Sequence, residues 1–329
     1  MQKSGKSYRN AICKKVHPLV RFYSPGFRQI SGGLIFSRST KHYGKIISMK
    51  LTIALAQINT TLGDVDANLE KHLSMAHDAW KHGAELVIFP ELSLTGYVLQ
   101  DIAATVAHRP MPDDPVFKRL LHASSEIDMV VGFVEEDERY RYYISAVYLS
   151  DGKIAHVHRK VYLPTYGIFD EKRYFATGNS FRAFETKFGR MGILICEDFW
   201  HASSPYTLWL DGADLMLFTS ASPGRGVTEE TLGSAQWVET VNRTYAGLFT
   251  TFVAHTNRVG FEDGLNFWGG STVFDPDGKQ IALAAYNEES LTFAELDLNQ
   301  LRRTRMRLPL LRDERSEVVL EELKRISGK

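Results

Sequence analysis

The fold is decided by residues 51–89, which read LTIALAQI over 51–58, ANLEKHLSMAHDAWKH over 67–82 and ELVIF over 85–89. The first and third runs are short and apolar, as buried strands are, and the middle run repeats apolar side chains at helical spacing before Gly83. A strand, a helix and a second buried strand in this order are typical of a layered α/β domain. We therefore predict the α/β class.

The rest of the chain continues this alternation and adds antiparallel strands. Asp151-Gly152 is a strong hairpin signal between strands predicted at 142–149 and 153–158. We see no linker, so one domain is predicted over 49–329, with a charged helix or tail after Leu298 that is available to a partner subunit. The other predicted elements are helices near 116–125, 205–210 and 231–245 and strands at 129–134, 191–196, 214–219, 249–255, 271–274, 280–285 and 291–295.

The composition favours a large, self-sufficient core. The chain has 329 residues, of which 44% are apolar and 12% aromatic, so no metal or disulfide is needed to fold it. No apolar run approaches the roughly 18 residues of a membrane-spanning helix. With two cysteines, Cys13 and Cys196, a disulfide framework is implausible, and we expect a cytoplasmic protein without a membrane partner.

The first 48 residues differ in charge from the remainder. Residues 1–48 contain ten Lys and Arg and no Asp or Glu, and Met49 stands directly before the ordered pattern. We interpret them as a disordered leader or a start-site artefact. An organelle-targeting peptide and a nucleic-acid-binding arm are the alternatives, but Pro18 and Pro25 interrupt any amphipathic period, and no nucleic acid is expected as a partner.

Cys196 is the candidate nucleophile. It ends the predicted strand MGILIC (191–196) and is followed by the polar and aromatic run EDFWH (197–201). A sharp turn at the end of a strand exposes its side chain and the N–H of the next residue, Glu197, which suits acyl transfer. The alternative is a structural cysteine packed as a small hydrophobe.

Two charged residues follow other predicted strands. Glu91 comes after the apolar run 86–90, where an apolar floor would raise its pKa and allow it to take a thiol proton. Lys160 comes after residues 154–159, and its ammonium would stabilise a thiolate and an oxyanion. The alternatives are that Glu91 caps the next helix and that Lys160 forms a solvated basic pair with Arg159.

Four further residues are candidates for supporting roles. Glu171 is predicted to orient Lys160 or the substrate amine, and the alternative is an ordinary loop charge. Tyr97, Tyr166 and Trp200 are predicted to line a pocket, and core or rim packing is the alternative for each. The pocket walls are expected from loops at 220–230 and 258–268.

Several kinds of chemistry lack sequence support. No set of histidines or cysteines has metal-ligand spacing, so no metal is predicted. The chain contains neither a Walker A loop nor GxGxxG, so no nucleotide cofactor is predicted, and it contains no Gly-x-Ser-x-Gly elbow.

Three motifs, taken in order, resemble the signatures of the nitrilase superfamily, the carbon–nitrogen hydrolases. They are Phe89-Pro-Glu91, Arg159-Lys160 with Leu163-Pro164, and Leu194-Ile-Cys-Glu-Asp198. The resemblance covers residues 51–310. Within the superfamily the chain is most similar to the glutaminase domain of glutamine-dependent NAD synthetases, on the residues of 90–97, 163–175 and 196–200.

The resemblance implies a four-layer α-β-β-α sandwich that forms a homodimer or larger homo-oligomer. It also implies roles for four residues: Glu91 as general base, Lys160 as the oxyanion-stabilising lysine, Cys196 as nucleophile and Glu171 as the supporting glutamate. The chain departs from the NAD synthetases because no Ser-Gly-Gly-x-Asp-Ser loop is present and the chain stops where a synthetase domain would begin. Released ammonia is then expected to be the product or to pass to a separate ammonia-accepting enzyme.

The predicted function is hydrolysis of a small carboxamide, glutamine-like or aliphatic, to an acid and ammonia through a Cys196 thioester. Nitrilases favour Cys-Trp-Glu where this chain has Cys196-Glu197-Asp198, so an amide is expected rather than a nitrile. The alternatives are an N-carbamoyl-amine hydrolase with the same machinery and a catalytically inert binding module of the same fold.

Overall fold

The computed structural model describes residues 50–225, 227–228 and 231–328. All of them belong to one unit, Ile47–Lys329. The leader predicted over 1–48 lies outside the described residues, as does Cys13.

The first of two six-stranded sheets has the order β16-β1-β2-β3-β4-β5. Strands β1, β2 and β3 are parallel neighbours, and the other pairs are antiparallel, so the sheet is mixed. The hairpin predicted across Asp151-Gly152 is the β4–β5 pair. The strand bounds are β1 Lys50–Gln57, β2 Leu86–Ile88, β3 Asp128–Glu136, β4 Tyr142–Ser150, β5 Lys153–Arg159 and β16 Ser290–Asp297.

The second sheet has the order β15-β14-β11-β8-β7-β6, with β7, β8 and β11 parallel. Its strands are β6 Phe184–Thr186, β7 Gly189–Ile195, β8 Leu215–Ser220, β11 Phe252–Asn257, β14 Thr272–Phe274 and β15 Gln280–Leu283. Two small antiparallel pairs lie outside both sheets: β9 Val227–Thr228 with β10 Thr231–Leu232, and β12 Val259–Glu262 with β13 Leu265–Trp268.

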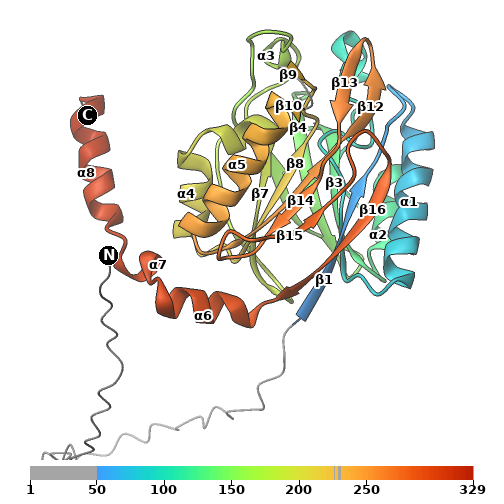
Figure 1. Cartoon of the computed structure of the whole chain (residues 1–329). Coiled ribbons are helices and arrows are strands. Elements are labelled where there is room, and N and C mark those ends of the chain that lie inside the picture. The colour runs from blue at the N-terminus through green and yellow to red at the C-terminus, as the bar shows by residue number, and fades with distance from the viewer. Residues whose placement is uncertain (1–49, 226, 229–230, 329) are drawn as a thin grey trace, which may run out of the picture. The chain divides into compact units, whose positions relative to one another are not determined.

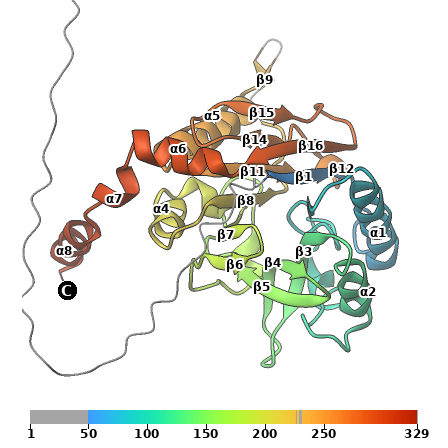
Figure 2. The ribbon, with the colours of Figure 1, turned by 90° about the horizontal axis from the view of Figure 1, so that it is seen from below.

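Helices cover the outer face of each sheet (Figures 1 and 2). Helices α1 (Val65–Lys81) and α2 (Pro115–Ala123) pack on the first sheet through a buried apolar cluster. Helices α4 (Ser203–Leu210) and α5 (Gly233–Leu248) pack on the second sheet through another. A third cluster, which includes Ile53, joins the facing sides of the two sheets. The predicted four-layer α-β-β-α sandwich is therefore confirmed.

Capping side chains explain where the first two helices begin. The Asp64 carboxylate accepts the Ala67 N–H at 3.0 Å, and Asp114 accepts the Val116 N–H at 2.9 Å directly before Pro115. These bonds satisfy N–H groups that have no partner inside the helix. Proline suits the first helical position because it has no N–H to satisfy.

The short elements are η1 (Gln100–Ala104), α3 (Glu171–Tyr174) and η2 (Cys196–Trp200), and the chain continues through α6 (Asn299–Arg307), α7 (Leu310–Asp313) and α8 (Ser316–Ser327). The charged helical segment predicted after Leu298 is therefore present. No residue of α8 is buried within this chain. Among the described residues, no helix is long and apolar enough to cross a membrane.

The structure corrects three predictions of local structure. The helix predicted over 231–245 runs from Gly233 to Leu248, and the next strand begins at Phe252 rather than 249 because the chain turns there: Thr251 N–H donates to the Ala246 carbonyl at 3.1 Å. The loop predicted over 258–268 is the β12–β13 hairpin. The strand predicted over 191–196 ends at Ile195, because Cys196 begins η2.

Candidate active site

Three candidate residues follow strands that end at the same edge of the sandwich. Glu91 follows β2 and Lys160 follows β5 in the first sheet, while Cys196 follows β7 in the second. Strand β5 is antiparallel to β4, which is antiparallel to β3, so β5 runs in the direction of β2 and β3. Because the two sheets pack face to face, these strand ends bring residues from distant parts of the sequence together.

Cys196 occupies a strained position on its turn. Its φ is +44°, in the left-handed region that residues with a Cβ rarely adopt. Such backbone strain persists only where the surroundings impose it, and it concentrates at functional sites. The turn between β7 and η2 leaves Cys196 8% exposed at the base of a pocket.

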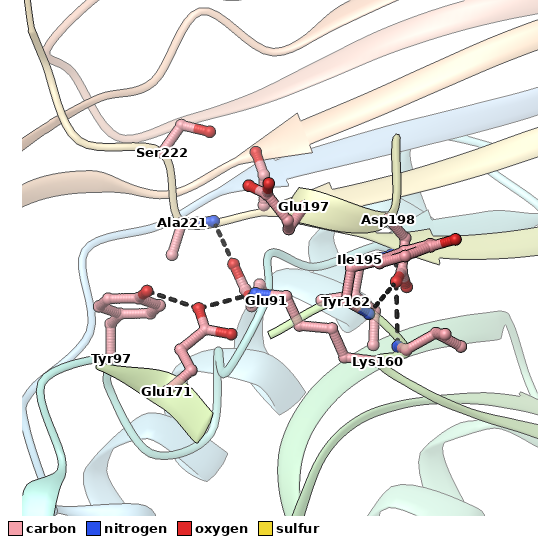
Figure 3. A network of polar contacts seen from close by, with 12 residues as sticks. Glu91, Tyr97, Lys160, Tyr162, Glu171, Ile195, Glu197, Asp198, Ala221 and Ser222 are labelled. Carbon is pink, nitrogen blue, oxygen red and sulfur yellow. Dashed lines mark hydrogen bonds and ion pairs between the residues drawn. The ribbon is translucent and has the colours of Figure 1, made fainter. Parts of the chain in front are cut away.

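Figure 3 shows a buried charged cluster of Glu91, Lys160, Glu171 and Tyr97. Glu91, Lys160 and Glu171 lie close enough to Cys196 to act on the charge of its thiol. The Lys160 ammonium donates to Glu91 Oε1 and to Glu171 Oε1, each at 2.7 Å. The Tyr97 hydroxyl donates to Glu171 Oε1 at 2.6 Å, and the Ala221 N–H donates to Glu91 Oε2 at 2.9 Å. The side chains of Glu91 and Lys160 have no exposed surface, so these bonds are shielded from water.

The pKa shifts in this cluster have identifiable causes. Burial raises the pKa of Glu171 to about 7, although Lys160 opposes the shift. Burial alone would lower the pKa of Lys160, but the carboxylates of Glu171 and Glu91 raise it well above its usual value. Lys160 therefore stays cationic at neutral pH.

The pKa of the Cys196 thiol is raised well above its usual value, first by burial and then by Glu91. Lys160 acts in the opposite direction and does not outweigh them. Lys160 thus favours the thiolate, in the predicted direction, but burial and Glu91 keep the resting thiol neutral. A neutral thiol needs a base to attack a carbonyl.

Cys196 opens onto a pocket of about 510 Å³. The Tyr166 hydroxyl donates to both oxygens of the Glu197 carboxylate, at 2.9 and 3.1 Å. The Arg225 guanidinium lies 4.7 Å from the centre of the Phe169 ring. We call Tyr166, Glu197 and Arg225 the pocket mouth; the pocket therefore presents a carboxylate and a guanidinium to whatever enters it.

The structure separates the predicted supporting residues into two groups. Tyr166 and Trp200 line the Cys196 pocket, and Trp200 is 37% exposed. Tyr97 instead contacts Glu171 and lines a separate cavity of about 140 Å³. Glu171, the first residue of α3, is buried against Lys160 and is no ordinary loop charge.

Sequence reasoning missed several residues of the site. Arg225 lies in the 220–230 loop that was expected to supply a pocket wall, but neither it nor Trp237 was predicted individually, and Asp198 belonged to a motif without an assigned role. The alternative given for Lys160, a solvated basic pair with Arg159, does not hold, because Lys160 is buried against Glu91 and Arg159 pairs with Glu135. In the part of the chain that the structure describes, no three His, Cys, Asp or Glu side chains are grouped as a metal site would require.

Comparison with known proteins gives consistent results. The glutamine-dependent NAD(+) synthetase of Acinetobacter baylyi is 34% identical over 253 residues, which are 76% of this chain and 45% of that protein. The N-carbamoylputrescine amidase of Solanum lycopersicum is 27% identical over 281 residues, covering 82% of this chain and 93% of that protein. This chain therefore spans less than half of the first relative and most of the second.

A solved structure, the carbon-nitrogen hydrolase of Helicobacter pylori G27, matches with a TM-score of 0.75 at 26% identity and covers 84% of this chain and 99% of that one. The family model described as carbon-nitrogen hydrolase matches residues 52–306, from β1 into α6. This chain belongs to the carbon–nitrogen hydrolases of the nitrilase superfamily.

Proposed function

We propose that this protein is a thiol amidohydrolase that cleaves a small carboxamide with Cys196 as its nucleophile. The observation that carries the proposal is the buried charged cluster beside Cys196, at the base of a pocket large enough for a small substrate. A buried lysine between two carboxylates is costly to fold unless each charge is paired. Its position beside a strained cysteine supports a catalytic role.

In the proposed mechanism, Glu91 takes the Cys196 proton as the sulfur attacks the amide carbon. The Lys160 ammonium and the N–H of Glu197 stabilise the oxyanion. The C–N bond then breaks, Glu91 returns the proton to the departing nitrogen, and ammonia leaves a thioester. Water attacks the thioester, Glu91 takes a proton from it, the C–S bond breaks, and the proton returns to the sulfur.

The hydrogen bonds of the cluster are consistent with Glu91 as the base and Lys160 as the stabilising cation. Each Glu91 oxygen accepts one bond, from Lys160 or from Ala221, and a carboxylate oxygen has a second lone pair that can receive a proton. Because the resting thiol is neutral, its proton is expected to leave as the new bond forms. Lys160 remains charged throughout, since Glu171 and Glu91 both raise its pKa.

The pocket mouth favours a glutamine-like substrate over an aliphatic amide. An amide that also carries an α-ammonium and an α-carboxylate would pair with Glu197 and Arg225 respectively, both of which line the pocket with Cys196. An aliphatic amide would offer neither Glu197 nor Arg225 an opposite charge. The similarity to glutamine-dependent NAD(+) synthetases supports the same substrate class.

An N-carbamoyl amine is the second candidate, supported by the similarity to N-carbamoylputrescine amidase. Its amine end would pair with Glu197, but Arg225 in the same pocket would repel it. An inert binding module is the least supported alternative, because the buried charged cluster would then have a folding cost without a chemical use.

The test is ammonia release by the full chain from L-glutamine, L-asparagine, propionamide and N-carbamoyl amines, with Cys196→Ala as the control. We expect turnover of L-glutamine and its loss in Cys196→Ala. Carbon dioxide among the products would identify a carbamoyl substrate. Turnover of another amide with glutamine untouched would contradict the substrate class, and full turnover by Cys196→Ala would contradict the nucleophile.

A further inference from the structure

Asp198 is a buried carboxylate that the mechanism above does not use. It follows Cys196 by two residues and has no exposed surface. Its Oδ1 accepts the N–H groups of Val161 and Tyr162, each at 2.9 Å. Its Oδ2 accepts the Ile195 N–H at 3.2 Å and lies 2.9 Å from His158 Nε2.

These bonds join the two sheets at the site. Val161 and Tyr162 directly follow Lys160 at the end of β5 in the first sheet, whereas Ile195 directly precedes Cys196 at the end of β7 in the second (Figure 3). One carboxylate therefore binds the backbone of the two residues that follow Lys160 and the backbone of the residue that precedes Cys196. Because each bond is made to backbone, it fixes main-chain position rather than a flexible side chain.

The bond to Ile195 also closes the strained turn. Cys196, with its positive φ, lies between Ile195 and Asp198, so the Asp198 carboxylate spans the residue whose conformation is unfavourable. Such conformations persist where surrounding bonds impose them. Asp198 thus restrains the nucleophile's backbone and the backbone of the residues after the lysine at the same time.

His158 completes the set of donors to Asp198. An ionised carboxylate can only accept hydrogen bonds, so His158 Nε2 carries a hydrogen and donates it. His158 is buried, and its ring packs near Phe181 with the ring centres 5.8 Å apart. With this bond each Asp198 oxygen has two donors, which fixes the rotation of the carboxylate.

We propose that Asp198, oriented by His158, is a positioning residue that sets the Cys196 sulfur against the Lys160 ammonium. The inference rests on the proposed amidase function, because it assigns a purpose to the relative placement of those two groups. A misplacement of about 1 Å in such a site costs on the order of 100-fold in rate.

The experiment compares Asp198→Asn, His158→Gln and His158→Ala with the matched control Asp128→Asn. Asp128 is equally buried and accepts bonds from Tyr148, Ser150 and Lys187, each at 2.8 Å. It lies at the start of β3, at the edge opposite the site. Each variant is measured for kcat and KM of ammonia release from L-glutamine and for its urea midpoint of unfolding.

We expect Asp198→Asn to lower kcat about 100-fold and to change KM less than about threefold. The asparagine NH2 group would face the Ile195 N–H and His158 Nε2, which both donate to Asp198, so these hydrogen bonds would be lost. His158→Gln retains a donor and should stay within about fivefold of the wild type, whereas His158→Ala should lose about tenfold. Asp128→Asn should lower the urea midpoint comparably and leave kcat unchanged. Wild-type kcat in folded Asp198→Asn, or an equal kcat loss in Asp128→Asn, would overturn the proposal.

A second readout needs no substrate. Iodoacetamide alkylation is followed at the Cys196 peptide by mass spectrometry, which separates it from Cys13. If Asp198 holds the thiol near the Lys160 ammonium, the pH of half-maximal alkylation rate should rise in Asp198→Asn and not in Asp128→Asn. If the wild type releases no ammonia from any amide, the proposed function fails. The shift in the pH of half-maximal alkylation rate then decides the positioning role by itself: its presence supports the role, and its absence overturns it.

Discussion

The buried charged cluster and the pocket mouth contain the same kinds of group in different surroundings. Each combines a tyrosine that donates to a carboxylate with a cation nearby: Tyr97, Glu171 and Lys160 in the cluster, and Tyr166, Glu197 and Arg225 at the mouth. The side chains of Lys160 and Glu171 in the cluster are at most 5% exposed, whereas at the mouth Tyr166 is 53% exposed and the Glu197 side chain is 13% exposed. The comparison separates what performs the reaction from what selects the substrate.

Burial accounts for the difference. Charges in a low-dielectric interior interact strongly and require full pairing, whereas exposed charges are screened and exchange partners with water. The cluster should therefore tolerate no substitution without loss of kcat. Substitutions at the mouth should change KM and leave kcat nearly unchanged, because these groups contact the end of the substrate that does not react.

The largest effect is expected from Lys160→Met, which keeps the length of the side chain and removes the charge between Glu91 and Glu171. Loss of the oxyanion-stabilising charge should lower kcat by at least about 10³-fold, and two carboxylates left unpaired should cost about 3 kcal/mol of unfolding free energy at neutral pH. Steady-state kinetics and urea unfolding measure both.

The matched control is the neighbouring Arg159→Met. Arg159 pairs with Glu135 at a partly exposed position outside the cluster. Because the Glu135 side chain is only 5% exposed, loss of Arg159 should lower stability, but kcat should change less than about threefold, since this pair lies outside the cluster. Equal losses of kcat in the two variants would mean that general disruption of this strand end, rather than the buried charge, explains the result.

Glu171→Gln tests the cluster through its pH dependence. Glutamine retains an acceptor for Tyr97 and Lys160 but cannot titrate, and we expect kcat to fall about 10²-fold as Lys160 loses a charged partner. The pKa of Glu171 is raised from 4.5 to about 7 in the folded protein. Between pH 4.5 and 7 the folded protein therefore keeps a proton on Glu171 that the unfolded chain has lost. Wild-type stability should therefore fall by about 1–3 kcal/mol from pH 4.5 to 7 and then level off.

Urea unfolding of both proteins between pH 4 and 8 measures this difference. The Glu171→Gln curve should lack the decline that the wild type shows between pH 4.5 and 7. Parallel curves for the two proteins would indicate that Glu171 is ionised throughout the range, as an ion pair with Lys160 that outweighs its burial.

The sequence predicted the cluster better than the mouth for the same physical reason. Glu91, Lys160 and Cys196 each follow a strand whose apolar run is readable in one dimension, and strands of a layered sheet end at shared edges. The four-layer sandwich, by contrast, was expected from three motifs that resemble a family. The contact of Lys160 with Glu171 was among the predictions, whereas the contact of Asp198 with the residues that follow β5 was not, because it depends on how the two sheets pack.

The mouth lacked any periodic signal. Arg225 stands in an irregular segment, where no regular pattern links a residue to the direction of its side chain.

The β12–β13 hairpin was taken for a loop because its strands are four residues long and contain Gly260 and Asn266. The sequence did not reveal that the resting Cys196 thiol is neutral, because burial, which a sequence does not display, outweighs the favourable effect of Lys160 on the thiolate.

A moderate effect is expected from Arg225→Leu, confined to substrates with a carboxylate. Loss of a charge-assisted bond of about 2 kcal/mol should raise KM for L-glutamine about 30-fold with kcat nearly unchanged. Propionamide, which has no carboxylate, serves as the matched control substrate, and its kcat/KM should stay level or rise. A loss that is equal for both substrates would place Arg225 in the reaction rather than in selection.

The smallest effect is expected from Tyr166→Phe. The change removes the hydroxyl that donates to Glu197 and leaves the ring, which packs edge-on against Phe169 with the ring centres 5.7 Å apart. The carboxylate remains and water can replace the lost donor, so KM for L-glutamine should rise only about threefold, the equivalent of one exposed hydrogen bond. The matching change in the cluster, Tyr97→Phe, removes a bond that water cannot easily replace and should lower kcat instead. If both variants altered the same kinetic constant, burial would not be what separates reaction from selection at this site.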